Sequence, residues 1–99
     1  MSTAEQSLNR TLQAISDPTR RRILQALRER GGCSLGKDIG LCACDVEQRV
    51  HLSQPTISHH MSVLKKAGLV QAKKQGQWVW YCRNEKAIGD LARTLRETL

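Results

Sequence analysis

Three of the four cysteines fall near one another in this chain of 99 residues. Cys42 and Cys44 are separated by one residue, and Cys33 lies in the preceding stretch 31–41, which holds four glycines. Thiolates are soft ligands that suit thiophilic ions such as Cd, Pb or Zn, and this preference alone does not select among them. Disulfides are the other use of neighbouring cysteines, but they need an oxidising compartment. The pattern therefore predicts free thiols or a thiolate site.

A regular helix would not let Cys42 and Cys44 bind the same ion. Residues two apart on a helix point about 200° away from each other. Either Cys42 lies before the first turn of the helix expected at 43–50, or ion binding unwinds that turn. Cys33 is the obvious third ligand, since the glycine-rich loop could fold it back onto the other two. We expect Cys82, much later in the chain, to be structural or incidental.

The charge balance points to a polyanionic partner. The formal net charge is +7, and no Asp or Glu occurs from Gln48 to Asn84. Such a surface attracts nucleic acid or membrane surfaces, and a solvated basic face without a partner is the alternative. No apolar run is long enough to span a membrane, and residues 1–6 lack the regions of a secretory signal. We therefore expect a cytoplasmic protein with no membrane partner.

Start and stop signals divide the chain into short helices. The first helix is expected at 3–16. Asp17 as N-cap and Pro18 at the first helical position begin a second helix, which also carries positive charge on Arg20, Arg21 and Arg22. After the glycine-rich loop we expect a third helix at 43–50. Ser53 as N-cap and Gly68 as a left-handed stop bound a fourth, at 54–67.

The remaining third of the chain changes pattern. Residues 70–83 are strand-like, with a tight turn at Gln75-Gly76. Asn84 then caps a last helix at 85–98. Its apolar stripe has no other core to cover it, so we expect it to meet the first helix and a second subunit. The members of the stripe are Ile88, Leu91, Leu95 and Leu99.

These elements predict one domain that spans residues 1–99. The fold class is mainly α with a β-hairpin wing: a dimeric winged helix-turn-helix of about five helices and two strands. The helix-turn-helix is expected at 43–67, the wing at 70–83 and the dimerisation helices at 3–16 and 85–98. The second helix of such a motif usually enters the major groove of DNA.

Polar and basic side chains on the expected recognition helix and wing are candidates for DNA contact. They offer hydrogen-bond donors and acceptors for base edges and positive charge for phosphates. The candidates are Gln54, Thr56, Ser58, His59, His60 and Lys65 on the helix, and Lys73, Lys74 and Gln75 on the wing. The alternative is that any one of them serves packing, capping or solubility.

Several segments together resemble the ArsR/SmtB family of metalloregulators. They are the run Leu52 to Met61, Leu64 to Val70, the wing from Gly76 to Tyr81, and Asp17-Pro18-Thr19-Arg20. The resemblance covers nearly the whole chain. It implies a homodimer held by the first and last helices, which binds an imperfect inverted repeat in the promoter of its own operon and leaves when an inducer binds.

Within that family, Cys42-Ala43-Cys44 is similar to the Cys-x-Cys box of the arsenic- and antimony-responsive members. The resemblance implies As(III) or Sb(III) as inducer, bound by two or three thiolates, with no cofactor required for DNA binding. The last helix has no His and a single Asp, Asp90, so it lacks the ligands of the zinc site of some relatives. The N-terminal segment lacks the cysteine of the cadmium and lead branch.

Other functions remain open at this point. A thiol-redox sensor could form a reversible disulfide between Cys33 and either Cys42 or Cys44. A DNA-binding regulator without a thiol-linked inducer is a third possibility. An enzyme is disfavoured, because the sequence has no nucleophile with a base and an orienting group, no phosphate loop and no carboxylate pair.

Overall fold

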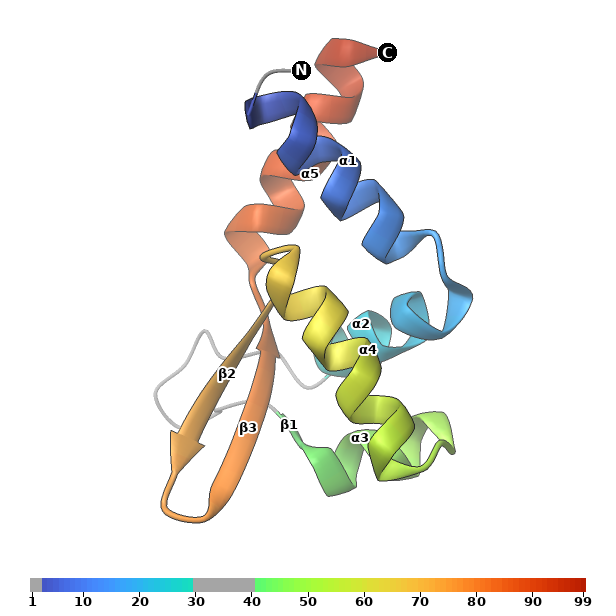
Figure 1. Cartoon of the computed structure of the whole chain (residues 1–99), viewed down its shortest axis with the longest axis vertical. Coiled ribbons are helices and arrows are strands. Elements are labelled where there is room, and N and C mark those ends of the chain that lie inside the picture. The colour runs from blue at the N-terminus through green and yellow to red at the C-terminus, as the bar shows by residue number, and fades with distance from the viewer. Residues whose placement is uncertain (1–2, 30–40) are drawn as a thin grey trace.

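The helices and strands follow the expected order, with one addition (Figure 1). The computed structural model describes residues 3–29 and 41–99. Within them lie α1 (Thr3–Ile15), α2 (Pro18–Glu29), β1 (Leu41–Cys42), α3 (Ala43–Val50), α4 (Gln54–Lys66), β2 (Val70–Gln75), β3 (Trp78–Arg83) and α5 (Glu85–Thr98). Strand β1 is the element that the sequence does not predict, so the described fold has three strands where two are expected.

The core lies where α2, α3 and α4 meet the sheet. Each helix contributes apolar residues spaced three or four apart, which puts them on one helix face. Burial of these side chains is what holds the helix-turn-helix together. The largest fully buried side chains are Ile23, Leu27, Val46, Ile57, Met61, Leu64 and Leu69.

The turn between α3 and α4 forms around His51, as expected. His51 adopts a left-handed φ of 58°, which reverses the chain directly after α3. Ser53 is the N-cap of α4 and has extended backbone, but its side chain makes no capping bond to the helix backbone. Its Oγ instead lies 3.0 Å from Oγ1 of Thr56.

The sheet has the order β1-β3-β2, and both of its pairings are antiparallel. Gln75 pairs with Trp78, which leaves Gly76 and Gln77 as the two-residue loop. The expected turn at Gln75-Gly76 is therefore wrong by one residue. Gly76 has a φ of 61° and stands first in the loop, which is the position that a type II′ hairpin gives to glycine.

Strand β1 joins the cysteine box to the wing. Leu41 pairs with Tyr81 and Cys42 pairs with Trp80. A strand of two residues has no periodicity of its own, and it exists only because β3 offers a free edge. Sequence patterning could not reveal it for that reason.

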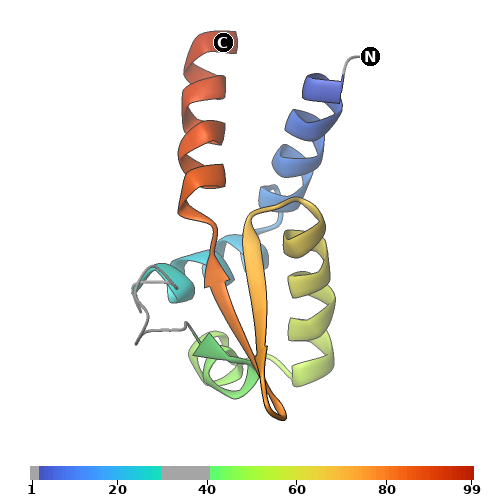
Figure 2. The same ribbon diagram turned by 90° about the vertical axis from the view of Figure 1, so that its left-hand side faces the viewer.

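The outer helices α1 and α5 project from one end of the molecule, where both termini lie (Figures 1 and 2). The tip of the wing and α3 lie at the other end. Helix α5 has no buried residue within the chain. Asn84 caps it as expected, because its side chain accepts a hydrogen bond from the backbone N–H of Ala87 at 3.1 Å.

Gly68 ends α4 with a φ of 81°. A Cβ at this position would meet no atom within 4 Å, so the penalty of a side chain is purely conformational. We expect Gly68→Ala to lower the free energy of unfolding by about 1–2 kcal/mol. Urea denaturation measures this, with Gly89→Ala in α5 as the matched control. Gly89 also has open space around it, and the same change there should stabilise by about 0.5–1 kcal/mol.

Candidate nucleic-acid interface and thiol site

The N-terminal half of α4 presents polar side chains to solvent. Gln54, Ser58 and His59 are exposed, and Thr56 is half-buried beside Ser53. The opposite face of the helix is anchored in the core by Ile57 and its buried neighbours. Helix α4 therefore has one packed face and one face of hydrogen-bonding groups available to DNA.

The basic residues continue this surface toward the wing. Lys65 is exposed near the end of α4, and it lines a groove together with Ser58 and Tyr81 of β3. Lys73 and Lys74 are exposed on β2. The side chain of Gln75 lies outside the described part of the structure. The described candidates thus lie on α4 and on the wing beside it.

Removing one wing lysine tests for a phosphate contact. Each phosphate that a lysine neutralises contributes about 0.9 to the slope of log K against log salt concentration. We therefore expect Lys73→Gln to make that slope shallower by about 0.9. Fluorescence anisotropy at several salt concentrations gives the slope. Lys86→Gln in α5 removes the same charge from an exposed site outside α4 and the wing, where Lys86 pairs with Asp90, and it should leave the slope unchanged. An equal change in both variants would reveal a general charge effect.

The three arginines of α2 bond to other helices. Arg21 Nη1 donates to the carbonyl of Ile15 at 2.7 Å, and Arg22 Nη2 donates to the carbonyl of Val50 at 3.0 Å. These carbonyls end α1 and α3, where no further helical N–H is available and positive charge is favourable. Arg20 also bonds to carbonyls of α1. The sequence shows only their charge, whereas the structure shows three helix-capping donors.

His60 differs from the other candidates on α4. Its side chain is only 14% exposed, and its Nδ1 lies 3.4 Å from Oδ2 of Asp17. The buried residues Ile57, Met61 and Leu64 share its face of the helix, because His60 lies three residues after the first and four before the last. That spacing is the sequence signal that could have separated His60 from its neighbour His59.

The backbone of the cysteine box is partly strand and partly helix. Cys42 ends β1, and α3 begins at Ala43, so Cys44 lies in the first turn. Of the two arrangements that the sequence allows, the first is confirmed: Cys42 lies before the helix. Cys33 and the side chains of Cys42 and Cys44 lie outside the described residues. Among the side chains that are described, no three His, Cys, Asp or Glu residues gather into a possible metal site.

Cys82 is buried in β3, with 3% of its surface exposed, and it is disulfide-bonded. This differs from the expectation of free thiols or a thiolate site in place of disulfides. Three other cysteines exist as possible partners, namely Cys33, Cys42 and Cys44. All three are the residues predicted to bind an inducer. The bonded partner of Cys82 lies outside the described side chains.

No helix in the described ranges 3–29 and 41–99 has the length and apolar character needed to cross a membrane.

Comparison with known proteins agrees with this architecture. The family model for "Bacterial regulatory protein, arsR family" matches residues 17–72. The transcriptional repressor SdpR of Bacillus subtilis is 36% identical over 84% of this chain and 82% of its own length. An arsenical resistance operon repressor of Staphylococcus aureus is 38% identical over 89% of this chain and 76% of its own length. Among solved structures, an ArsR-like transcriptional regulator from Rhodococcus sp. RHA1 superimposes with a TM-score of 0.79 at 27% identity, covering 98% of this chain and 83% of that protein.

The matched segment 17–72 begins at the Asp17 cap of α2, includes the whole helix-turn-helix and extends into β2. It makes up more than half of the chain. The fold and the sequence therefore agree on one assignment: this chain belongs to the arsR family of bacterial regulatory proteins and is a DNA-binding transcription regulator.

Proposed function

We propose that the chain is a homodimeric repressor that releases its operator when As(III) or Sb(III) binds the thiolates of Cys42, Cys44 and Cys33. One observation carries the proposal: Cys42 ends a strand and Cys44 lies in the first turn of α3. Since Cys42 lies in a strand and Cys44 in a helix, the geometry that separates residues two apart on one regular helix does not apply to them. Soft thiolates are the ligands that such thiophilic ions prefer.

This position offers a route from inducer to DNA. Helix α3 packs against α4 and is the first helix of the DNA-reading pair. Strand β1 is hydrogen-bonded to β3 of the wing. An ion that draws Cys42 and Cys44 together would therefore act on both DNA-facing elements. Its coupling to operator affinity need be only about 1–3 kcal/mol, which is typical of such regulation.

The polar and basic residues of α4 and the wing support operator binding through the major groove by Gln54, Thr56, Ser58 and His59, with phosphate contacts from Lys65, Lys73, Lys74 and Gln75. Helix α5 supports the homodimer. Its stripe residues Ile88, Leu91 and Leu95 are only half-buried, and Leu99 is 97% exposed. A second copy of α5 and α1 would remove this apolar surface from water.

The relatives support regulation by repression but differ in what their names state. One is an arsenical resistance operon repressor, at 38% identity. SdpR, at 36% identity, is named only as a transcriptional repressor. The inducer therefore has to be tested on this chain itself.

The test is fluorescence anisotropy of a labelled DNA fragment from the promoter of the chain's own operon. Fully reduced protein is bound to it and titrated separately with arsenite, antimonite, cadmium, zinc and peroxide. Arsenite or antimonite should weaken binding by about 5- to 150-fold. Release by cadmium or zinc alone would reject the metalloid, and release by none of them would reject a thiol-bound inducer.

A second candidate function is thiol-redox sensing, which the disulfide of Cys82 favours. Peroxide would oxidise two thiols to a disulfide and would itself be reduced to water. Because Cys82 lies on β3 of the wing, the bond would tie a wing strand to one of the predicted ligands. This candidate predicts that oxidised protein binds operator differently from reduced protein, that a thiol reductant reverses the difference, and that Cys82→Ala abolishes it.

A further inference from the structure

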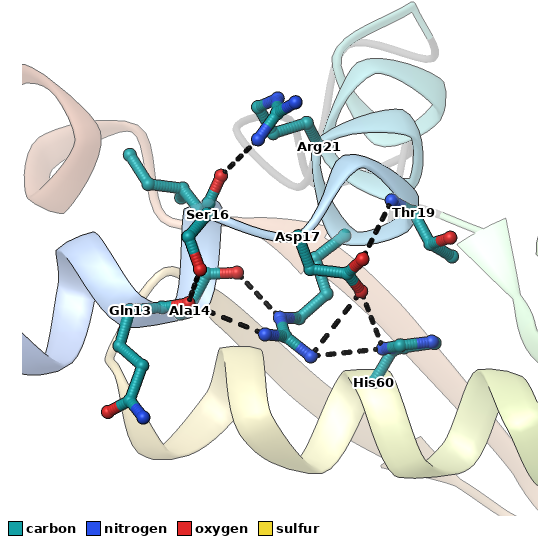
Figure 3. A network of polar contacts seen from close by, with 9 residues as sticks. Gln13, Ala14, Ser16, Asp17, Thr19, Arg21 and His60 are labelled. Atoms are coloured by element: carbon teal, nitrogen blue, oxygen red, sulfur yellow. Dashed lines mark hydrogen bonds and ion pairs between the residues drawn. The ribbon is translucent and has the colours of Figure 1, made fainter.

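A polar network joins the recognition helix to two other helices (Figure 3). His60 of α4 lies with its Nδ1 3.2 Å from Nη1 of Arg20 and 3.4 Å from Oδ2 of Asp17. The same Nη1 lies 3.5 Å from Oδ2 of Asp17. A carboxylate, a guanidinium and an imidazole thus meet at one point between α2 and α4.

The network extends to the end of α1. Arg20 Nε donates to the carbonyl of Ala14 at 2.5 Å, and its Nη2 donates to the carbonyl of Gln13 at 3.4 Å. Asp17 also accepts a hydrogen bond from the backbone N–H of Thr19 at 3.4 Å. Arg20 therefore holds the last turn of α1 with one part of its guanidinium and His60 with another.

We propose that His60 is a positioning residue for DNA binding, which seats α4 against the α1–α2 turn through Asp17 and Arg20. The proposal rests on α4 being the helix that reads DNA. With 14% of its side chain exposed, His60 has little surface left for a base or phosphate. Its contacts instead fix how α4 sits relative to α1, one of the two helices proposed to hold the dimer.

Protonation of His60 rearranges this network. A neutral ring can accept a hydrogen bond from Arg20 at an unprotonated Nδ1, whereas a charged ring has a proton on both nitrogens and accepts none. Burial lowers the pKa of His60; the nearby Asp17 carboxylate raises it, and the positive Arg20 and the neighbouring His59 lower it further. The lowered pKa favours the neutral ring, and in the tautomer that carries its proton on Nε2 the Nδ1 atom can accept from Arg20.

The experiment compares four variants on the promoter fragment, without inducer: His60→Ala, His60→Asn, Asp17→Asn and the double variant of Asp17→Asn with His60→Ala. Because hydrogen bonds couple His60 to Asp17 and Arg20, we expect His60→Ala to weaken operator affinity about tenfold. His60→Asn places an amide oxygen near the position of Nδ1 and should restore most of that affinity. Asp17→Asn keeps the cap of α2 but removes the charge, and combined with His60→Ala it should cost no more than His60→Ala alone. The slope of log affinity against log salt concentration should stay the same in all four.

A direct DNA contact predicts different results. In that case the salt slope would change in His60→Ala, His60→Asn would not restore affinity, and the Asp17 and His60 changes would add independently; these outcomes would overturn the proposal. Thermal unfolding of His60→Asn checks that the fold is kept. Because wild-type binding is measured without arsenite, failure here leaves the metalloid proposal standing, and failure of arsenite release leaves this one standing.

The pH dependence of operator affinity distinguishes a His60 that acts through its titrating ring from one that only fills space. The amide that replaces the imidazole in the His60→Asn protein does not titrate, while the other two histidines are present in both proteins. The ratio of wild-type to His60→Asn affinity should therefore fall as the pH is lowered through the depressed pKa of His60. A ratio that stays constant from about pH 7.5 to about pH 5.5, the range in which histidines ordinarily titrate, would contradict the protonation step.

Discussion

Cys42→Ser protein is expected to bind the operator as tightly as wild type and to ignore arsenite. A serine hydroxyl stays protonated at neutral pH and is a hard ligand, so it does not replace a thiolate at a thiophilic ion. Cys42 belongs to β1 and not to α4 or to the hairpin β2–β3, so DNA binding itself should survive. The release of about 5- to 150-fold expected for wild type should fall to none. Anisotropy in reducing buffer measures both quantities.

Cys82→Ala is the matched control for this change. It also removes one sulfur, but from a buried position on β3 outside the predicted ligand set. In reducing buffer it should keep the arsenite response. If Cys42→Ser were released at the same arsenite concentration as wild type, Cys42 would not be a ligand. If Cys82→Ala lost the response instead, the thiolate set would have to include Cys82.

The largest loss of stability is expected from Leu64→Ala in the recognition helix. Leu64 is completely buried where α4 meets the rest of the core. Deleting a buried leucine side chain costs about 2–5 kcal/mol, partly from lost burial and partly from the cavity that remains. The whole free energy of unfolding of such a domain is about 5–15 kcal/mol. Urea denaturation should therefore show a much lower midpoint, and operator binding should fall with the folded fraction.

Leu99→Ala removes the same atoms at a position that is 97% exposed. Its expected effect within one chain is below about 0.5 kcal/mol. Equal losses at Leu64 and Leu99 would contradict the core described above. A loss at Leu99 that grows with protein concentration would instead indicate that a second subunit covers α5.

The helix boundaries could be predicted because they depend on local chemistry. Pro18 begins α2 and Gly68 ends α4 in the left-handed conformation, and both lie where the sequence predicts them. Asn84 caps α5 through its own side chain, again as expected. Each of these residues acts within about one turn of itself, so a single sequence is enough to identify its effect.

The parts that could not be predicted depend on partners distant in the chain. Strand β1 exists because residues 41–42 pair with β3, almost forty positions later. Arg22 looks like one of three surface charges until the carbonyl of Val50 is seen beside it. His59 and His60 are adjacent residues of the same type, yet it is His60 that contacts Asp17 and Arg20. The spacing of His60 from Ile57 and Leu64 could have placed it on the packed face of α4, whereas its contacts with Asp17 and Arg20 could not be predicted from the sequence.

If the short ladder between β1 and β3 couples the thiol site to the wing, that coupling acts in both directions. The backbone that carries Cys42 and the strand that forms the wing share hydrogen bonds. If a bound metalloid weakens operator binding by some factor, then bound operator weakens metalloid binding by the same factor. The inducer concentration needed for half-release would rise with the number of operator copies that the repressor occupies. The detection threshold would therefore depend on both the protein and its promoter.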